Sequence, residues 1–172
     1  RLQAHTQVKL SPGSQLLKEA APRHVISLPE GSWGEGGYHW IWLNDMNDWT
    51  WRHIYPAEKE MEELAQLFAE DPDPRLQDLL KQCGRSLFLL EPSDWQFLIS
   101  TFSARDYAEL RLVVHHDDFK RLALMARRYA AERDLPSEDW NFLTFCRERD
   151  DIFPDIDPKW WAKLQYPPVE VE

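Results

Sequence analysis

The feature that most constrains the fold is a stretch of about thirty residues, from Ser103 to the residue before Pro136, that contains neither glycine nor proline. A helix over this stretch would be on the order of 45 Å long. Asp118 interrupts an apolar stripe that helical spacing predicts to be buried, and the stripe reads Tyr107, Leu110, Val114, Leu122, Met125 and Tyr129. Because such a helix needs other elements to cover its apolar side, the sequence indicates a helical bundle.

The same spacing predicts the partners of this helix. One helix ends near Glu70, a second covers residues 74–90, and a third covers residues 137–149. Their buried sides are assigned Ile54, Ala57, Met61, Leu64 and Phe68, then Leu76, Leu79, Leu80, Cys83, Leu87 and Leu90, and finally Trp140, Leu143 and Phe145 or Cys146. Shorter helical segments are expected at 14–20, 93–102 and 158–162. The predicted fold is all-α, a bundle of four to five helices with irregular N- and C-terminal arms.

Local signals mark several helix boundaries. Ser93, with a glutamine three residues later, has the spacing of a capping box, in which both side chains satisfy backbone amides at a helix start. Ser103 repeats the start signal with an acidic residue three positions later. Pro56 either kinks one long helix that starts near Asp45 or occupies the first turn of a helix that starts there, and both alternatives stay open.

Composition excludes several classes of protein. The net charge of −10 disfavours contact with a polyphosphate backbone, so we expect no nucleic-acid partner. No apolar run is long enough to span a membrane, and the first ten residues lack the apolar core of a signal peptide. Cys83 and Cys146 lie in separate predicted helices and are expected to be reduced and buried. We therefore expect a soluble, cytoplasmic protein.

Tryptophan is concentrated in one segment of the chain. Five of the nine tryptophans fall within nineteen residues, 33–51, behind a loop at 30–37 that holds four of the six glycines. Indole faces stack on the C–H faces of sugars, and carboxylates suit sugar hydroxyls, so this composition favours carbohydrate. Trp33 stands between glycines, and Trp42 belongs to the run 40–43, which would place side chains on both sides if it is extended. We single out Trp33 and Trp42; the alternative is an aromatic plug against a neighbouring domain.

Two other groups of polar residues are candidates for a site. Four contiguous residues read His-His-Asp-Asp, but successive helical residues point about 100° apart and cannot converge on one ion, so we expect no metal site. Arg111, His115 and Asp118 share a helix face and are expected to form a buried structural network, with substrate contact as the alternative. Asp94 and Trp95 lie at a predicted helix start, where Asp94 either accepts hydrogen bonds from two hydroxyls or only caps the helix.

Three motifs together resemble the C-terminal helical domain of α-glucan branching enzymes of glycoside hydrolase family 57. The first comprises residues 28–37 with 40–44 and 49–51, the second 93–99, and the third 115–119, in the family's order. The resemblance covers residues 22–129 and is loose beyond Pro136. It assigns residues 1–29 to the tail of a catalytic domain and residues 30–172, including a cleft loop at 30–51, to the helical domain. A start at arginine rather than methionine is consistent with an excised fragment, and a processed or trimmed chain would look the same.

The resemblance also implies a function. In such enzymes a (β/α)7 barrel cleaves an α-1,4 bond of a glucan and transfers the chain to a 6-hydroxyl, while the helical domain packs on the barrel and completes its cleft. Carried over, Trp33 and Trp42 are the cleft tryptophans and Asp94 is a substrate-binding carboxylate, with Glu35 and Trp95 as further candidates. A retaining mechanism needs two carboxyl groups flanking the bond. The family's catalytic pair falls outside this chain, so we expect the fragment alone to be inactive, without cofactor; the alternative is a free-standing module that binds carbohydrate or protein.

Overall fold

The computed structural model describes residues 10–20 and 24–163, which form two compact units divided between Ser32 and Trp33. In the first unit, α1 (Gly13–Glu19) has no buried residue, and residues 24–32 form no helix or strand. The second unit contains η2 (Glu35–Gly37) and six α-helices: α2 (Asp48–Phe68), α3 (Pro74–Leu90), α4 (Asp94–Ser100), α5 (Arg105–Glu132), α6 (Ser137–Arg149) and α7 (Lys159–Ala162). The all-α prediction is confirmed, and the described residues contain no strand.

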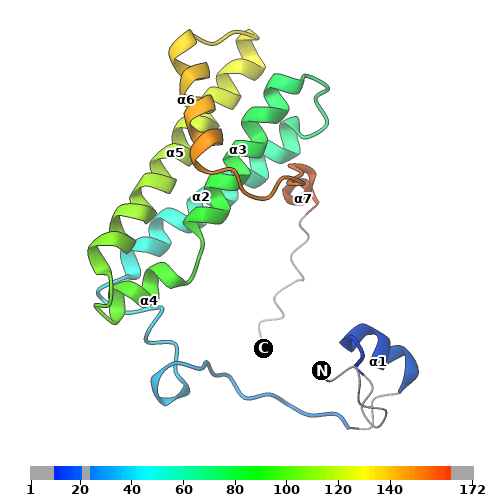
Figure 1. Ribbon diagram of the computed structural model, residues 1–172, viewed down its shortest axis with the longest axis vertical. Helices are drawn as coiled ribbons and strands as arrows, with labels where there is room; N and C mark the ends of the chain where they lie inside the picture. The colour runs from blue at the N-terminus through cyan, green and yellow to red at the C-terminus, as the bar shows by residue number, and fades with distance from the viewer. Residues whose placement is uncertain (1–9, 21–23, 164–172) are drawn as a thin grey trace, which may run out of the picture. The chain divides into compact units, whose positions relative to one another are not determined.

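Three long helices, α2, α3 and α5, enclose the core of the second unit. α5 runs the length of the bundle, with α4 near its N-terminal end and α6 beside its C-terminal half (Figure 1). The interior consists mainly of leucine, methionine and alanine, and its largest fully buried side chain is Phe119. The predicted buried sides of α2 and α3 are almost entirely confirmed, because only Phe68 among them remains half-buried. Both cysteines are free and buried.

The apolar stripe predicted for α5 is wrong in its first half. Tyr107 and Leu110 are exposed, whereas Ala108, Leu112 and His115 are buried. α3 and α4 both pack on α5, and the buried positions 108, 112 and 115 are spaced by four and three residues, so they share one face of the helix. From Leu122 to Tyr129 the predicted stripe is buried. On α6 the buried alternative is Cys146, and Phe145 is exposed.

Both predicted N-terminal caps are wrong. Ser93 precedes α4 with helical backbone angles and makes no side-chain cap, and Gln96 instead donates a hydrogen bond of 3.0 Å to the buried hydroxyl of Thr50. The N-cap of α5 is Ala104 without a side-chain cap, because the hydroxyl of Ser103 is bonded to Thr101. A tertiary partner thus replaced the first predicted cap, and a local hydrogen bond replaced the second.

The tertiary structure shows how Pro56 and Gly84 are accommodated in their helices. Pro56 lies inside a continuous α2 that begins at Asp48, which supports the long-helix alternative. Gly84 lies in α3 under α7, where a Cβ atom would be 2.8 Å from the ring of Trp161 and 2.9 Å from Ile156. A side chain at this position would therefore displace α7.

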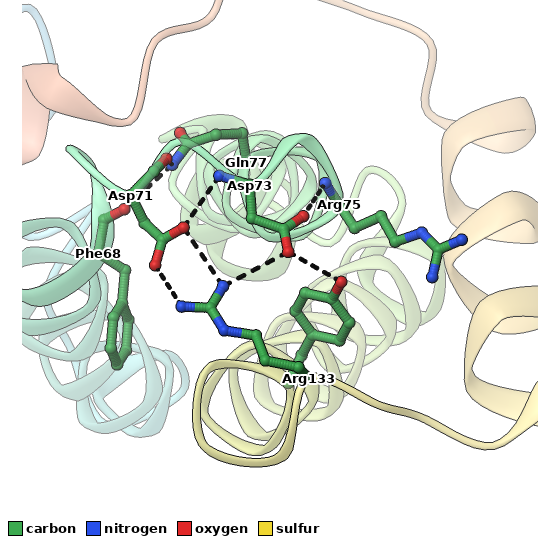
Figure 2. A network of polar contacts seen from close by, with 7 residues as sticks. Phe68, Asp71, Asp73, Arg75, Gln77 and Arg133 are labelled. Atoms are coloured by element: carbon green, nitrogen blue, oxygen red, sulfur yellow. Dashed lines mark hydrogen bonds and ion pairs between the residues drawn. The ribbon is translucent and has the colours of Figure 1, made fainter.

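An ion-pair network fixes the far end of the bundle. Arg133, which follows α5 in the left-handed conformation, pairs with Asp71 at 2.6 Å and with Asp73 at 3.4 Å, in the connection between α2 and α3 (Figure 2). Asp73 caps α3 by accepting from the amide of Arg75 and also accepts from the Tyr129 hydroxyl. The Arg133 guanidinium lowers the pKa of Asp71. This network joins three helices at the end opposite α4.

Candidate functional site

An exposed aromatic cluster lies at the start of the second unit. The rings of Trp33 and Trp42 meet edge to face, with centroids 5.1 Å apart, and Trp33 also contacts Phe97 of α4 at 5.5 Å. Trp33 is 76% exposed although it contacts two other rings. Trp42 and Phe97 are half-buried beneath it. We call Trp33, Trp42 and Phe97 the aromatic cluster.

The loop does not run in the extended conformation that the alternation of Trp40 and Trp42 suggested. Residues 40–43 form turns, since the amides of Trp42 and Leu43 both donate to the carbonyl of His39. Trp42 therefore reaches the cluster from a compact turn rather than from one face of a strand. The preceding turn, η2, has a local cause, because Gly36 and Gly37 take φ of 66° and 79°, which other residues rarely adopt.

Buried amides hold this loop against α4. The Asn47 side chain donates 2.9 Å hydrogen bonds to the carbonyl of Ile41 and to the hydroxyl of Ser100, and it accepts from the amide of Asn44. Ser100 in turn donates to Ile41 at 2.6 Å and accepts from Asn44 at 2.8 Å. Because Asn47 is fully buried, each of these bonds would be costly to leave unmade. We call Asn44, Asn47 and Ser100 the loop network.

The start of α2 supports the loop from its other side. The indole nitrogen of Trp51 donates to the carbonyl of Trp42 at 2.9 Å, and that of Trp49 donates to Met46 at 3.1 Å. Both indoles also pack against the core. Two of the nine tryptophans thus hold in place the loop that presents Trp33 and Trp42.

The remaining predicted site residues lie on α4 and in η2. Asp94 is exposed and begins α4, one helical turn before Phe97, which places both on the same side of that helix. Glu35 is exposed in η2, two residues after Trp33. Trp95 is half-buried, packs edge to face on Tyr107, and donates its indole hydrogen to the carbonyl of Leu89 at 3.0 Å.

Sequence reasoning missed Phe97 as a member of the site. Its signal was the three-residue spacing from Asp94 on a predicted helix, which puts the two side chains on one face. Its contact with Trp33 could not be predicted, because it depends on how the loop folds over α4.

The second candidate, around His115 and Asp118, is a buried polar cluster. Asp118 pairs with Arg149 of α6 rather than with Arg111, and Arg149 also pairs with Asp150. The expectation of a buried network therefore holds, with a different cation. The ligand-type atoms of His115, Asp118 and Asp150 lie within 4.8 Å of one another, but the guanidinium already pairs with both carboxylates. Burial, followed by the charge of Arg111, lowers the pKa of His115 to about 4.

Comparison with known proteins identifies the family. The sequence model described as "1,4-alpha-glucan branching enzyme, C-terminal" matches residues 53–161, which is more than half of the chain. The chain belongs to this family of branching-enzyme C-terminal domains. Relative to the family's full-length members it is short, since it spans 21% of the 1,4-alpha-glucan branching enzyme of Thermococcus kodakarensis, to which it is 40% identical over 144 residues, 83% of its own length.

Solved structures agree with this assignment. The branching-enzyme domain superposes on a GH57-type branching enzyme from Pyrococcus horikoshii with a TM-score of 0.79 and 37% identity, covering 91% of this chain and 29% of that one. It matches the Thermococcus kodakaraensis GH57 branching enzyme, solved in complex with glucose and additives, with a TM-score of 0.80 and 36% identity over 93% and 28% of the two chains. The chain matches an α-amylase, AmyC of Thermotoga maritima, with a TM-score of 0.66 and 25% identity, covering 96% of this chain and 29% of that one.

No helix in residues 10–20 and 24–163 has the length and apolar character needed to cross a membrane.

Proposed function

We propose that this branching-enzyme domain binds α-1,4-glucan through the aromatic cluster, as one wall of a cleft whose catalytic groups lie in another part of a longer polypeptide. The observation that supports it is the exposure of Trp33, 76%, on a loop whose later part, residues 41–47, is tied to α4 by buried hydrogen bonds. Exposing an indole costs hydrophobic free energy, whereas a fixed indole face suits the apolar face of a sugar ring. The rigid support reduces the entropy lost on binding.

Asp94 supplies the polar contact in this proposal. It begins α4 one turn before Phe97, so its carboxylate can accept hydrogen bonds from hydroxyls of a sugar that stacks on Trp33. Glu35 is a second exposed carboxylate on the same loop. Trp95 can offer only a ring face, because its indole nitrogen already donates to Leu89.

The proposed reaction cleaves an α-1,4 bond and transfers the glucan to a 6-hydroxyl, with both catalytic carboxyl groups supplied by a (β/α)7 barrel. Here the domain would orient the glucan and exclude water, which favours a sugar acceptor over hydrolysis. Trp40 and Leu43, 51% and 60% exposed on the outside of the loop, offer apolar surface to the barrel. The free, buried cysteines suit a reducing compartment, and we propose a cytoplasmic location.

The test compares Trp33→Ala and Trp42→Ala in the branching enzyme that carries this chain. Stacking on Trp33 is worth about 1 kcal/mol or more, so branch formation on amylose should fall roughly fivefold or more, while the melting temperature changes little because Trp33 is exposed. Trp160→Ala, at an indole 51% exposed on α7, is the matched control and should leave branching unchanged. Loss of melting temperature in proportion to activity, or unchanged branching in the Trp33→Ala enzyme, would refute the proposal.

A further inference from the structure

A second aromatic surface lies on α2, directly behind the loop. The rings of Trp51 and Tyr55 stack with centroids 5.5 Å apart and planes at 27°. Tyr55 is 60% exposed, so one face of its ring meets Trp51 while the side chain remains largely open to solvent. Trp51 itself donates to the carbonyl of Trp42. The pair therefore adjoins the backbone of Trp42, a residue of the aromatic cluster.

A carboxyl group of α2, that of Glu58, follows on the same face and meets the carboxyl group of Glu91. Trp51, Tyr55 and Glu58 are spaced by four and three residues, so they lie in one row along about two helical turns. The side chain of Glu58 shares a hydrogen bond with Glu91, which follows the last residue of α3. Within the described ranges neither carboxyl pairs with a cation.

The electrostatics of this pair favour a neutral, hydroxyl-rich ligand. Burial, followed by the charge of Glu58, raises the pKa of Glu91 to about 7, so Glu91 is partly protonated near neutral pH. A carboxyl and a carboxylate together offer one donor and several acceptors. Neighbouring sugar hydroxyls both donate and accept, and they suit this arrangement, whereas a divalent cation prefers ionised carboxylates and further oxygen ligands.

We propose that the glucan-binding surface extends from the aromatic cluster along α2, where Tyr55 stacks on a sugar ring and the Glu58–Glu91 pair binds hydroxyls of a further ring. This inference rests on the proposed function and deepens it, since it assigns a path to the part of the glucan outside the cleft. A longer α-1,4-glucan would engage both surfaces, and a short one only the aromatic cluster. The α2 surface would thus select for chain length.

The test titrates the 172-residue chain with maltotriose and with maltoheptaose and follows backbone amide chemical shifts by NMR. Maltotriose should shift amides near Trp33 and Trp42 only, and maltoheptaose should also shift those of Tyr55 and Glu58. In Tyr55→Ala the dissociation constant for maltoheptaose should rise roughly two- to tenfold, as expected for the loss of one stacking contact, with that for maltotriose unchanged. Tyr55→Phe, which keeps the ring, should bind like the original chain, and Glu91→Gln should weaken only maltoheptaose.

Controls separate this inference from the proposed function. Phe145→Ala removes an aromatic ring of similar exposure from α6, a helix packed on α3 and α5, and should change neither constant. If Trp33→Ala weakens both sugars while Tyr55→Ala weakens neither, the α2 extension is wrong and the proposed function stands. Equal weakening of both sugars by Tyr55→Ala would also overturn the extension. If Trp33→Ala changes neither constant, the proposed function fails, and so does the extension that rests on it.

Discussion

Removing the buried amide of Asn47 should release the loop that carries the proposed glucan-binding tryptophans. Asn47→Ala deletes two donated hydrogen bonds, to Ile41 and Ser100, and one accepted from the amide of Asn44. Each bond contributes about 1 kcal/mol net, and the Asn44 amide loses its partner, so we expect a loss of roughly 2–4 kcal/mol in the free energy of unfolding. Since a domain has about 5–15 kcal/mol in total, the variant should still fold.

The assay measures stability and ligand binding in the same variants. Urea unfolding followed by circular dichroism gives the free energy, and a titration with maltotriose reports the aromatic cluster. Asn47→Asp separates donor from acceptor, because a carboxylate can still accept from Asn44 but repels the carbonyl of Ile41. This variant should be less stable than the original chain at pH 7 and should recover on acidification, because a protonated carboxyl can donate again.

An exposed asparagine of α6 provides the control for this substitution. Asn141→Ala removes an asparagine from an exposed position of α6 and should change stability by less than about 0.5 kcal/mol. The reasoning fails if Asn47→Ala is as stable as this control. It also fails if stability falls by several kcal/mol while maltotriose binds as before, since the network would then not position Trp33 and Trp42.

Two further predictions test the packing and the buried charges. Gly84→Ala gains about 1 kcal/mol of helix propensity, but its methyl group would lie within 3 Å of Trp161 and Ile156, an overlap that costs roughly 1–3 kcal/mol. We therefore expect the variant to have a lower free energy of unfolding in urea. A more stable variant would contradict the packing of α7. Because the pKa of His115 is lowered to about 4, only the unfolded chain binds a proton at His115 between pH 6.5 and pH 4. The contribution of His115 to the free energy of unfolding should therefore be lost as the pH falls through that window, by about 3 kcal/mol at most. Glu91, whose pKa is raised to about 7, changes stability with pH in the opposite sense, so the effect of His115 is isolated by comparing His115→Gln with the original chain at pH 7 and at pH 4.5. If the difference in free energy of unfolding between the two proteins is the same at both pH values, the lowered pKa is not that of His115.

The sequence alone predicted most of the secondary structure. α3 and α6 begin and end where apolar spacing and the flanking prolines indicated, because a long amphipathic helix has a period that few other structures share. The family was also predicted from sequence, since its motifs are rich in tryptophan and glycine, residue types with narrow structural uses. These features are local, and local features can be read from a single chain.

Tertiary structure alone decided which surfaces face one another. The cap predicted at Ser93 gave way to a buried bond from Gln96 to Thr50, and on α5 Ala108 and Leu112 are buried in place of Tyr107. Phe97 contacts Trp33 where the loop folds over α4, and Asn47 ties the loop to that helix through Ser100. Gln96 and Thr50 are 46 positions apart in sequence, and Asn47 and Ser100 are 53 positions apart, so no local pattern records the energies of these contacts. The sequence therefore determined the helices and the aromatic residues of the candidate site, whereas the site's geometry came from packing.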